Sequence, residues 1–172
     1  MLKLIAASIF LTASSSASAQ WIATKNENPF DNSETHFAVT AASQVVLGFR
    51  CATKGEDPMI ILLLPDEGSE AEAERLSILK PEIAVIVDAD ASVGLPSVVE
   101  SIELDGRRRL RLRSVEPEQS VALARRMAAA KRRIAVAASM GGKTFYATVL
   151  GVSGSRRAIG GAIDQCGIKP SS

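Results

Sequence analysis

Several kinds of side chain are scarce in this sequence of 172 residues. It has one histidine and two cysteines, and aromatic residues make up only 4% of the chain. One imidazole and two thiols are too few ligands for a tetrahedral zinc site. So few aromatic rings also disfavour a stacking platform for single-stranded nucleic acid. Beyond the N-terminus, no apolar run approaches the ~20 residues that cross a bilayer as a helix. The composition therefore points away from metal centres, nucleic-acid binding and integral membrane segments.

The first nineteen residues have the pattern of a secretory signal peptide. Lys3 supplies a positive charge, residues 4–13 are apolar, and residues 17–19 (Ala-Ser-Ala) are small, as a cleavage site requires. A membrane anchor is the competing interpretation, but the apolar run is too short for one. We therefore expect cleavage before Gln20, export to the periplasm or beyond, and one mature domain over residues 20–172.

The two cysteines, Cys51 and Cys166, are the only ones in the chain. An exported protein meets an oxidising environment, where an even cysteine count usually means pairing. The sequence therefore predicts one disulfide between Cys51 and Cys166. The alternative is two independent buried thiols.

Charge is balanced overall but segregated along the chain. The formal net charge is +1 at pH 7, so no overall field attracts nucleic acid or anionic lipid. Residues 56–105 hold thirteen acids and two bases, whereas residues 106–172 hold fourteen bases and three acids. Either the two halves pair across one fold, or the basic half forms a binding surface.

Apolar periodicity predicts many short strands. The expected strands are 21–23, 37–41, 45–51, 59–64, 83–87, 98–104, 107–113, 134–138 and 145–150. Turn residues fill the segment 26–33, Pro65 is expected to end the strand before it, and Asp105-Gly106 is the strongest hairpin signal. The acidic segment 66–80 is either a short exposed helix or a loop.

Two helices are expected late in the chain. Pro117 lies between Glu116 and Glu118, a combination typical of a first helical turn. Ser153 is the expected cap of a second helix, which ends at Gly167. The buried stripe of that helix consists of Ala158, Ile159, Ala162, Ile163 and Cys166. The predicted class is α+β, a mainly antiparallel sheet or sandwich with two helices in the C-terminal third.

An arginine-rich strand carries the candidate binding residues. Period-two spacing places Arg107, Arg109, Arg111 and Arg113 on one face, opposite Leu110 and Leu112. Guanidinium groups bind carboxylates and phosphates in a bidentate manner, so this face suits an acidic partner or ligand. The other basic candidates are Arg108, Arg125, Arg126, Lys131, Arg132 and Arg133. The competing interpretation is that these arginines pair with the acidic half.

Other motifs indicate structure rather than chemistry. Residues 137–144 fit a permissive phosphate-loop pattern, but residues 144–149 are β-branched and aromatic, so we expect a hairpin that binds no nucleotide. Asp88 and Asp90 lack the spacing of a calcium loop and are expected in a turn. His36 has no Ser, Cys or acid nearby to complete a catalytic arrangement. The aromatic residues expected in the core are Trp21, Phe30, Phe49, Phe145 and Tyr146. No catalytic residue, metal or cofactor is predicted.

The two ends of the chain resemble a known family. The relevant segments are Trp21, residues 28–31 (Asn-Pro-Phe-Asp), residues 46–51 (Val-Leu-Gly-Phe-Arg-Cys) and the closing pattern from Phe145 to Cys166-Gly167. They are similar to the VasI-type family of periplasmic type VI secretion accessory proteins and its unassigned alphaproteobacterial relatives. The resemblance implies a small exported sandwich with an Arg-Cys strand and a terminal helix that carries the second cysteine. Residues 66–113 have no counterpart in that pattern.

These observations favour a non-catalytic periplasmic protein, an accessory or interaction protein of an envelope or secretion system. The alternative is a secreted ligand-binding or inhibitor module that recognises an acidic partner through the arginine face. A hydrolase with an unrecognised site is a third hypothesis.

Overall fold

The computed structural model describes residues 20–43 and 45–169. Within them, one nine-stranded antiparallel sheet has the order β1-β2-β3-β4-β7-β6-β5-β8-β9. The strands are β1 (Ile22–Asn28), β2 (Ser33–Ala42), β3 (Val45–Ala52), β4 (Met59–Glu67), β5 (Glu82–Val87), β6 (Val93–Leu104), β7 (Arg107–Ser114), β8 (Ile134–Met140) and β9 (Lys143–Leu150). The expected signal peptide, residues 1–19, lies outside the described residues.

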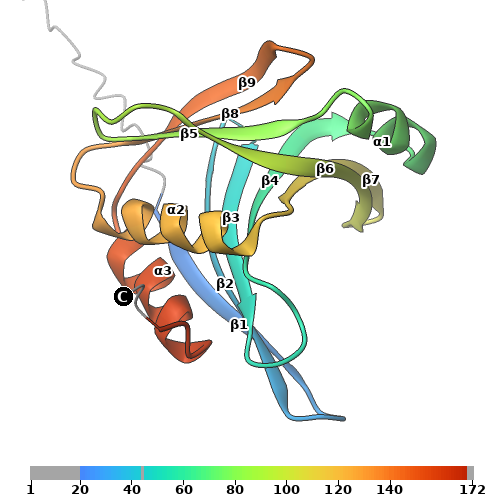
Figure 1. Cartoon of the computed structure of the whole chain (residues 1–172). Coiled ribbons are helices and arrows are strands. Elements are labelled where there is room, and N and C mark those ends of the chain that lie inside the picture. The colour runs from blue at the N-terminus through green and yellow to red at the C-terminus, as the bar shows by residue number, and fades with distance from the viewer. Residues whose placement is uncertain (1–19, 44, 170–172) are drawn as a thin grey trace, which may run out of the picture.

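Three helices accompany the sheet: α1 (Glu70–Ser77), α2 (Pro117–Ala129) and α3 (Ser155–Gln165). Figure 1 shows a strongly curled sheet with α2 and α3 side by side against it. Helix α3 packs on β1, β2 and β3, α2 packs on α3 and β4, and α1 packs on β6. The predicted α+β class, with two helices in the C-terminal third, is confirmed. No helix of the described ranges has the length and apolarity needed to span a membrane.

The core lies between the sheet and the two late helices. Alternate residues of the central strands are almost fully buried, as the period of two requires; they include Leu47, Phe49, Leu62, Leu64 and Leu112. The helices bury Leu123, Ala124, Met127, Ala158 and Ile159 against them. Each large apolar side chain buried in this way contributes about 1.5–3 kcal/mol to folding.

Strand pairing corrects two predicted boundaries. Residues 26–28 were expected in a turn, but they continue β1 because Ile22–Asn28 pairs with Ser33–Val39, and only residues 29–32 turn. The strand expected to end at Pro65 continues to Glu67. Proline is tolerated there because the register with β7 shifts between Leu63 and Glu67, so no ladder bond from its nitrogen is needed.

Within the acidic segment 66–80, residues 70–77 form α1, the helix of the two predicted alternatives, while residues 66 and 67 end β4. Ser69 is its N-cap: the Ser69 hydroxyl accepts from the Glu72 N–H, and the Glu72 carboxylate accepts from the Ser69 N–H. This capping box compensates for a helix of only eight residues.

The start of α3 differs from the sequence prediction. Gly154, not Ser153, is the N-cap, in a left-handed conformation with φ of 80°. The Trp21 N–H donates to the Ser153 carbonyl (2.9 Å), which brings the Trp21 carbonyl within 3.0 Å of the position that a Cβ on residue 154 would occupy. Only glycine fits this close approach, and it has no side chain to cap the helix.

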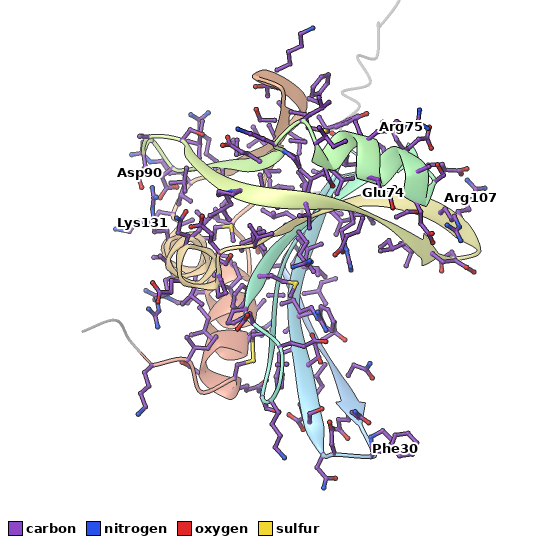
Figure 2. The ribbon with its side chains drawn as sticks, turned by 45° about the vertical axis from the view of Figure 1, so that its right-hand side comes forward. Phe30, Glu74, Arg75, Asp90, Arg107 and Lys131 are labelled. Carbon is purple, nitrogen blue, oxygen red and sulfur yellow. A yellow bond between two sulfur atoms is a disulfide. The ribbon has the colours of Figure 1, made fainter. Side chains whose placement is uncertain are left out.

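The aromatic residues divide between core and surface. Trp21 and Phe49 are buried as predicted, and the Trp21 indole N–H donates to the Gly151 carbonyl (3.0 Å). Phe30 and Phe145 were expected inside but are 96% and 41% exposed. Phe30 lies at the tip of the long β1–β2 hairpin, far from the core (Figure 2), and Phe145 lies on the edge strand β9.

Candidate functional site

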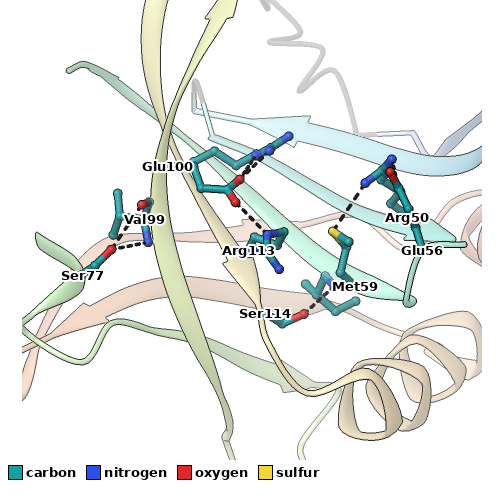
Figure 3. A network of polar contacts seen from close by, with 10 residues as sticks. Arg50, Glu56, Met59, Ser77, Val99, Glu100, Arg113 and Ser114 are labelled. Carbon is teal, nitrogen blue, oxygen red and sulfur yellow. Dashed lines mark hydrogen bonds and ion pairs between the residues drawn. The ribbon is translucent and has the colours of Figure 1, made fainter. Parts of the chain in front are cut away.

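The predicted arginine face exists and is occupied largely by ion pairs within the chain. Leu110 and Leu112 are buried, while the arginines alternate outward on β7. Glu100 on the neighbouring strand β6 accepts from Arg111 (Nη2, 2.5 Å) and Arg113 (Nε, 2.8 Å). Figure 3 shows this network on the sheet face. With the exposed pair Arg107–Glu67, three of the four predicted binding residues therefore already contact a carboxylate.

These contacts change the pKa of the Glu100 carboxyl group. Burial alone would raise its pKa, but the hydrogen bonds and positive charges of Arg113 and Arg111 outweigh burial and hold the pKa below its ordinary value. The carboxylate is therefore ionised at neutral pH and is shared by its two partners, which leaves a net charge of +1 on the group of three side chains. Arg109, the third member of the face, makes no ion pair with any described residue.

Acidic and basic residues that are segregated along the sequence pair with each other in the folded protein. The remaining ion pairs between the acidic and basic halves are Arg107–Glu67, Arg108–Glu70 and Arg126–Asp90. All three pairs are exposed, and exposed pairs are typically worth about 0.2–1 kcal/mol each. The arrangement favours a structural role for the arginine face over an acidic partner.

Cys51 and Cys166 form the predicted disulfide. Cys51 is buried on β3 and Cys166 ends α3, with 6.2 Å between their Cα atoms. Gly167 follows in a left-handed conformation and terminates the helix as predicted. The bond therefore fastens the terminal helix to the centre of the sheet.

The other singled-out residues are held in structural roles. The Asp88 carboxylate accepts from the backbone N–H groups of Lys131, Arg132 and Arg133, and these bonds lower its pKa. His36 was expected to have no acid nearby, but its buried Nε2 lies 3.1 Å from the Glu34 carboxylate, because alternate residues of a strand share a face; the contact lacks hydrogen-bond geometry. Residues 137–144 form the predicted hairpin, because Gly141 and Gly142 turn between β8 and β9 with positive φ angles.

A groove of about 460 Å³ is a candidate site that sequence reasoning missed. It opens between α1, the end of β4 and the β8–β9 hairpin. Its apolar lining continues from the core and consists of Leu64, Leu76, Leu79, Leu110 and Met140. Among its lining residues, Leu79 and Phe145 are 49% and 41% exposed, and Ile78, next to Leu79 in the chain, is 79% exposed. Single exposed apolar residues are ordinary, but two that border one apolar groove indicate a binding surface.

Local contacts hold the two sides of this groove in place. The Ser77 hydroxyl accepts from the Val99 N–H (3.0 Å) and fastens α1 to β6, as Figure 3 shows. The Gly141 N–H donates to the Leu79 carbonyl (3.0 Å) and links the hairpin to the end of α1. A Cβ on Gly68 would lie 2.5 Å from the Leu110 side chain, so glycine is needed for α1 to approach the groove floor.

Polar groups border the groove on two sides. The Tyr146 hydroxyl donates to the Asp66 carboxylate, and this bond, with burial, raises the pKa of Tyr146 to about 12. Tyr146 has φ of 52°, a costly conformation for an aromatic residue, at a bulge in the β8–β9 pairing. A second cleft, lined by Asp66, Glu67, Glu72 and Arg75, shares Leu76 and Leu110 with the groove. The groove therefore continues into an acidic margin.

One signal in the sequence indicated part of this site. Leu76 and Leu79 share the apolar spacing of the acidic segment, and Ile78 and Leu79 lie just beyond the end of α1 at Ser77. Leu79 lines the same groove as Phe145, 66 positions later in the chain, because of the order of strands in the sheet, and this has no local signature.

Comparison with protein families, curated proteins and solved structures found no match.

Proposed function

We propose that this protein is a non-catalytic interaction protein of the bacterial envelope that binds a segment of a partner protein in the groove between α1 and the β8–β9 hairpin. The exposed apolar residues Leu79 and Phe145, which border that groove, carry the proposal. Export by the N-terminal signal, residence in the periplasm and a role as accessory to a secretion system belong to the same proposal.

Charge complementarity defines the kind of segment. Helix α1 carries Glu70, Glu72 and Glu74 against a single base, Arg75, and the cleft that continues the groove adds Asp66 and Glu67. Arg108 and Arg107 pair with Glu70 and Glu67, and Lys143 lines the groove, so the acidic character of the margin comes from Asp66, Glu72 and Glu74, which make no ion pair within the described residues. A partner segment with apolar side chains flanked by lysine or arginine would match both the apolar floor and the acidic margin. The alternative, an acidic partner on the arginine face, is less favoured because Arg111 and Arg113 are already paired with Glu100, and Arg107 with Glu67.

The position of the histidine also supports a binding role. His36 is buried on β2 and does not line the groove, so it is not placed to act as a base on a bound molecule.

The proposal is tested by photo-crosslinking in the native host. A crosslinking amino acid is placed at position 79, and the control carries it at position 30, because Phe30 is exposed at the tip of the β1–β2 hairpin, far from α1 (Figure 2). We expect crosslinks to one envelope protein from position 79 only. A synthetic peptide covering the crosslinked segment then provides a defined ligand for titration.

The double variant Leu79→Ser/Phe145→Ser should weaken that peptide at least about tenfold, since each lost apolar contact is worth about 1–3 kcal/mol. Phe30→Ser should leave the affinity unchanged. Equal crosslinking from positions 79 and 30, or a peptide affinity that the double variant does not change, would contradict the proposal.

A further inference from the structure

A cationic cleft of about 740 Å³ lies at the opposite part of the molecule, between the end of α2 and the start of α3. Its apolar side consists of Ala128, Ala129, Ala130 and Val152. Three basic residues, Lys131, Arg156 and Arg157, line the rest of it, and Figure 2 shows Lys131 where α2 ends. None of the three makes an ion pair with another residue of the described ranges.

The first turn of α3 leaves backbone donors free at this cleft. Gly154 has no side chain to cap the helix, and a larger residue is excluded there because the Trp21 carbonyl approaches too closely. The Ser155 N–H donates to the Val152 carbonyl and the Ala158 N–H to the Gly154 carbonyl, but the N–H groups of Arg156 and Arg157 have no partner among the described residues. Such amides, at the positive end of a helix dipole, attract anions.

Ser155 gives a second, independent indication of a ligand. Its side chain is buried, with only 2% of the residue exposed, and it lines the cleft. Its hydroxyl makes no hydrogen bond within the described part of the chain, yet it is not among the fully enclosed unpaired atoms. The hydroxyl therefore opens into the cleft, where it is ready to donate to a bound group.

The charges at this helix start are unfavourable without a counter-ion. Arg156 and Arg157 are the second and third residues of α3, and no acidic residue lies in its first turn. Basic side chains at this end repel the helix dipole instead of compensating it. On the other side, the end of α2 exposes carbonyls that favour a cation, which Lys131 supplies.

We propose that this cleft binds the phosphate group of an organic phosphate. Two amides, one hydroxyl and three cationic side chains offer more donors than the two oxygens of a carboxylate use, whereas a phosphate presents three strong acceptor oxygens. The cleft is much larger than a phosphate ion, and its alanine-rich side suits the apolar portion of the molecule that bears the phosphate. A soluble phosphate ester and a phospholipid head group share this chemistry.

Nuclear magnetic resonance titration of the folded protein locates the binding. The probes are inorganic phosphate, glycerol 3-phosphate, and vesicles of phosphatidylcholine with or without phosphatidylglycerol. We expect the largest amide shifts at Arg156 and Arg157 with the soluble phosphates. Binding only to the phosphatidylglycerol vesicles would identify a lipid head group as the source.

Variants separate this site from general positive charge. Arg156→Gln/Arg157→Gln should lower the affinity at least about tenfold, and Ser155→Ala about three- to tenfold, because charge-assisted hydrogen bonds are lost. The control Arg107→Gln/Arg108→Gln removes the same charge from an exposed hairpin. Ser155→Ala should leave the melting temperature of the free protein unchanged, since its hydroxyl has no protein partner.

Failure to bind any probe would overturn the proposal, as would an equal effect of the control and the Arg156/Arg157 variant. Amide shifts that are largest away from the start of α3 would also overturn the proposal. None of these outcomes bears on the groove at α1, because the two sites share no lining residue.

Discussion

Reduction of the Cys51–Cys166 bond should destabilise this protein strongly. The bond closes a loop with a sequence separation of 115 residues. For a loop of that length, the loss of chain entropy in the unfolded state corresponds to about 4.8 kcal/mol of stability at 25 °C. A domain of this size loses about 2–4 °C of melting temperature per kcal/mol, so we expect the midpoint to fall by about 10–20 °C.

The assay is thermal unfolding of the oxidised and the reduced wild-type protein, followed by circular dichroism and by tryptophan fluorescence. Trp21 is the only tryptophan and is hydrogen-bonded to the β9–α3 connection, so its fluorescence reports on the attachment of α3. If the bond acts on the unfolded chain, both signals should change together at one lowered midpoint. The melting temperature of Cys51→Ala/Cys166→Ala should be lower than that of the reduced wild type, because truncating the buried Cys51 also leaves a cavity.

A midpoint shift below about 3 °C would refute the loop-closure argument, since the expected shift is several times larger. An early fluorescence transition in the reduced protein, ahead of the loss of strand signal, would also refute it. That result would mean that the bond mainly holds α3 on the folded sheet.

Two further predictions concern charge. Arg111→Gln should lower stability by about 1 kcal/mol because Glu100 loses one of two partners, whereas Arg109→Gln, on the same face but without an ion pair, should stay within about 0.5 kcal/mol; urea unfolding measures both, and equal losses would contradict the pairing argument. Stability should fall as the pH drops below about 4.5, because the folded pKa values of Asp88 and Glu100 lie below their unfolded values and their contribution is lost as they take up protons. Asp88→Asn should reduce the loss of unfolding free energy between pH 6 and pH 3, measured by urea unfolding at both pH values. An unchanged loss would exclude Asp88 as its source.

The sequence predicted most of the local structure because the signals are short-range. Alternation predicted the strand pair at residues 37–51, Asp105-Gly106 predicted the β6–β7 hairpin, and Pro117 predicted the start of α2. Boundaries failed where a distant segment decided them. Pro65 remains inside β4 because of a bulge opposite β7, and Gly154 replaces Ser153 as the cap because Trp21 approaches it.

The candidate sites depended on the tertiary structure in different degrees. Period two alone placed the arginines on one face, but only the neighbouring strand showed that Glu100 holds two of them. The groove combines the end of α1 with β9, and the cationic cleft combines the end of α2 with the start of α3.

The sequence by itself therefore determined most strands and helices and the sheet-rich class, because periodicity and turn chemistry leave few alternatives. It also determined the pairing of the cysteines, because the chain has only two. Only the tertiary structure decided which charges are neutralised, which aromatic residues are exposed and where the clefts lie. Those properties depend on which segments become neighbours, and strand order in an antiparallel sheet is set by the fit of whole faces, which no local pattern records.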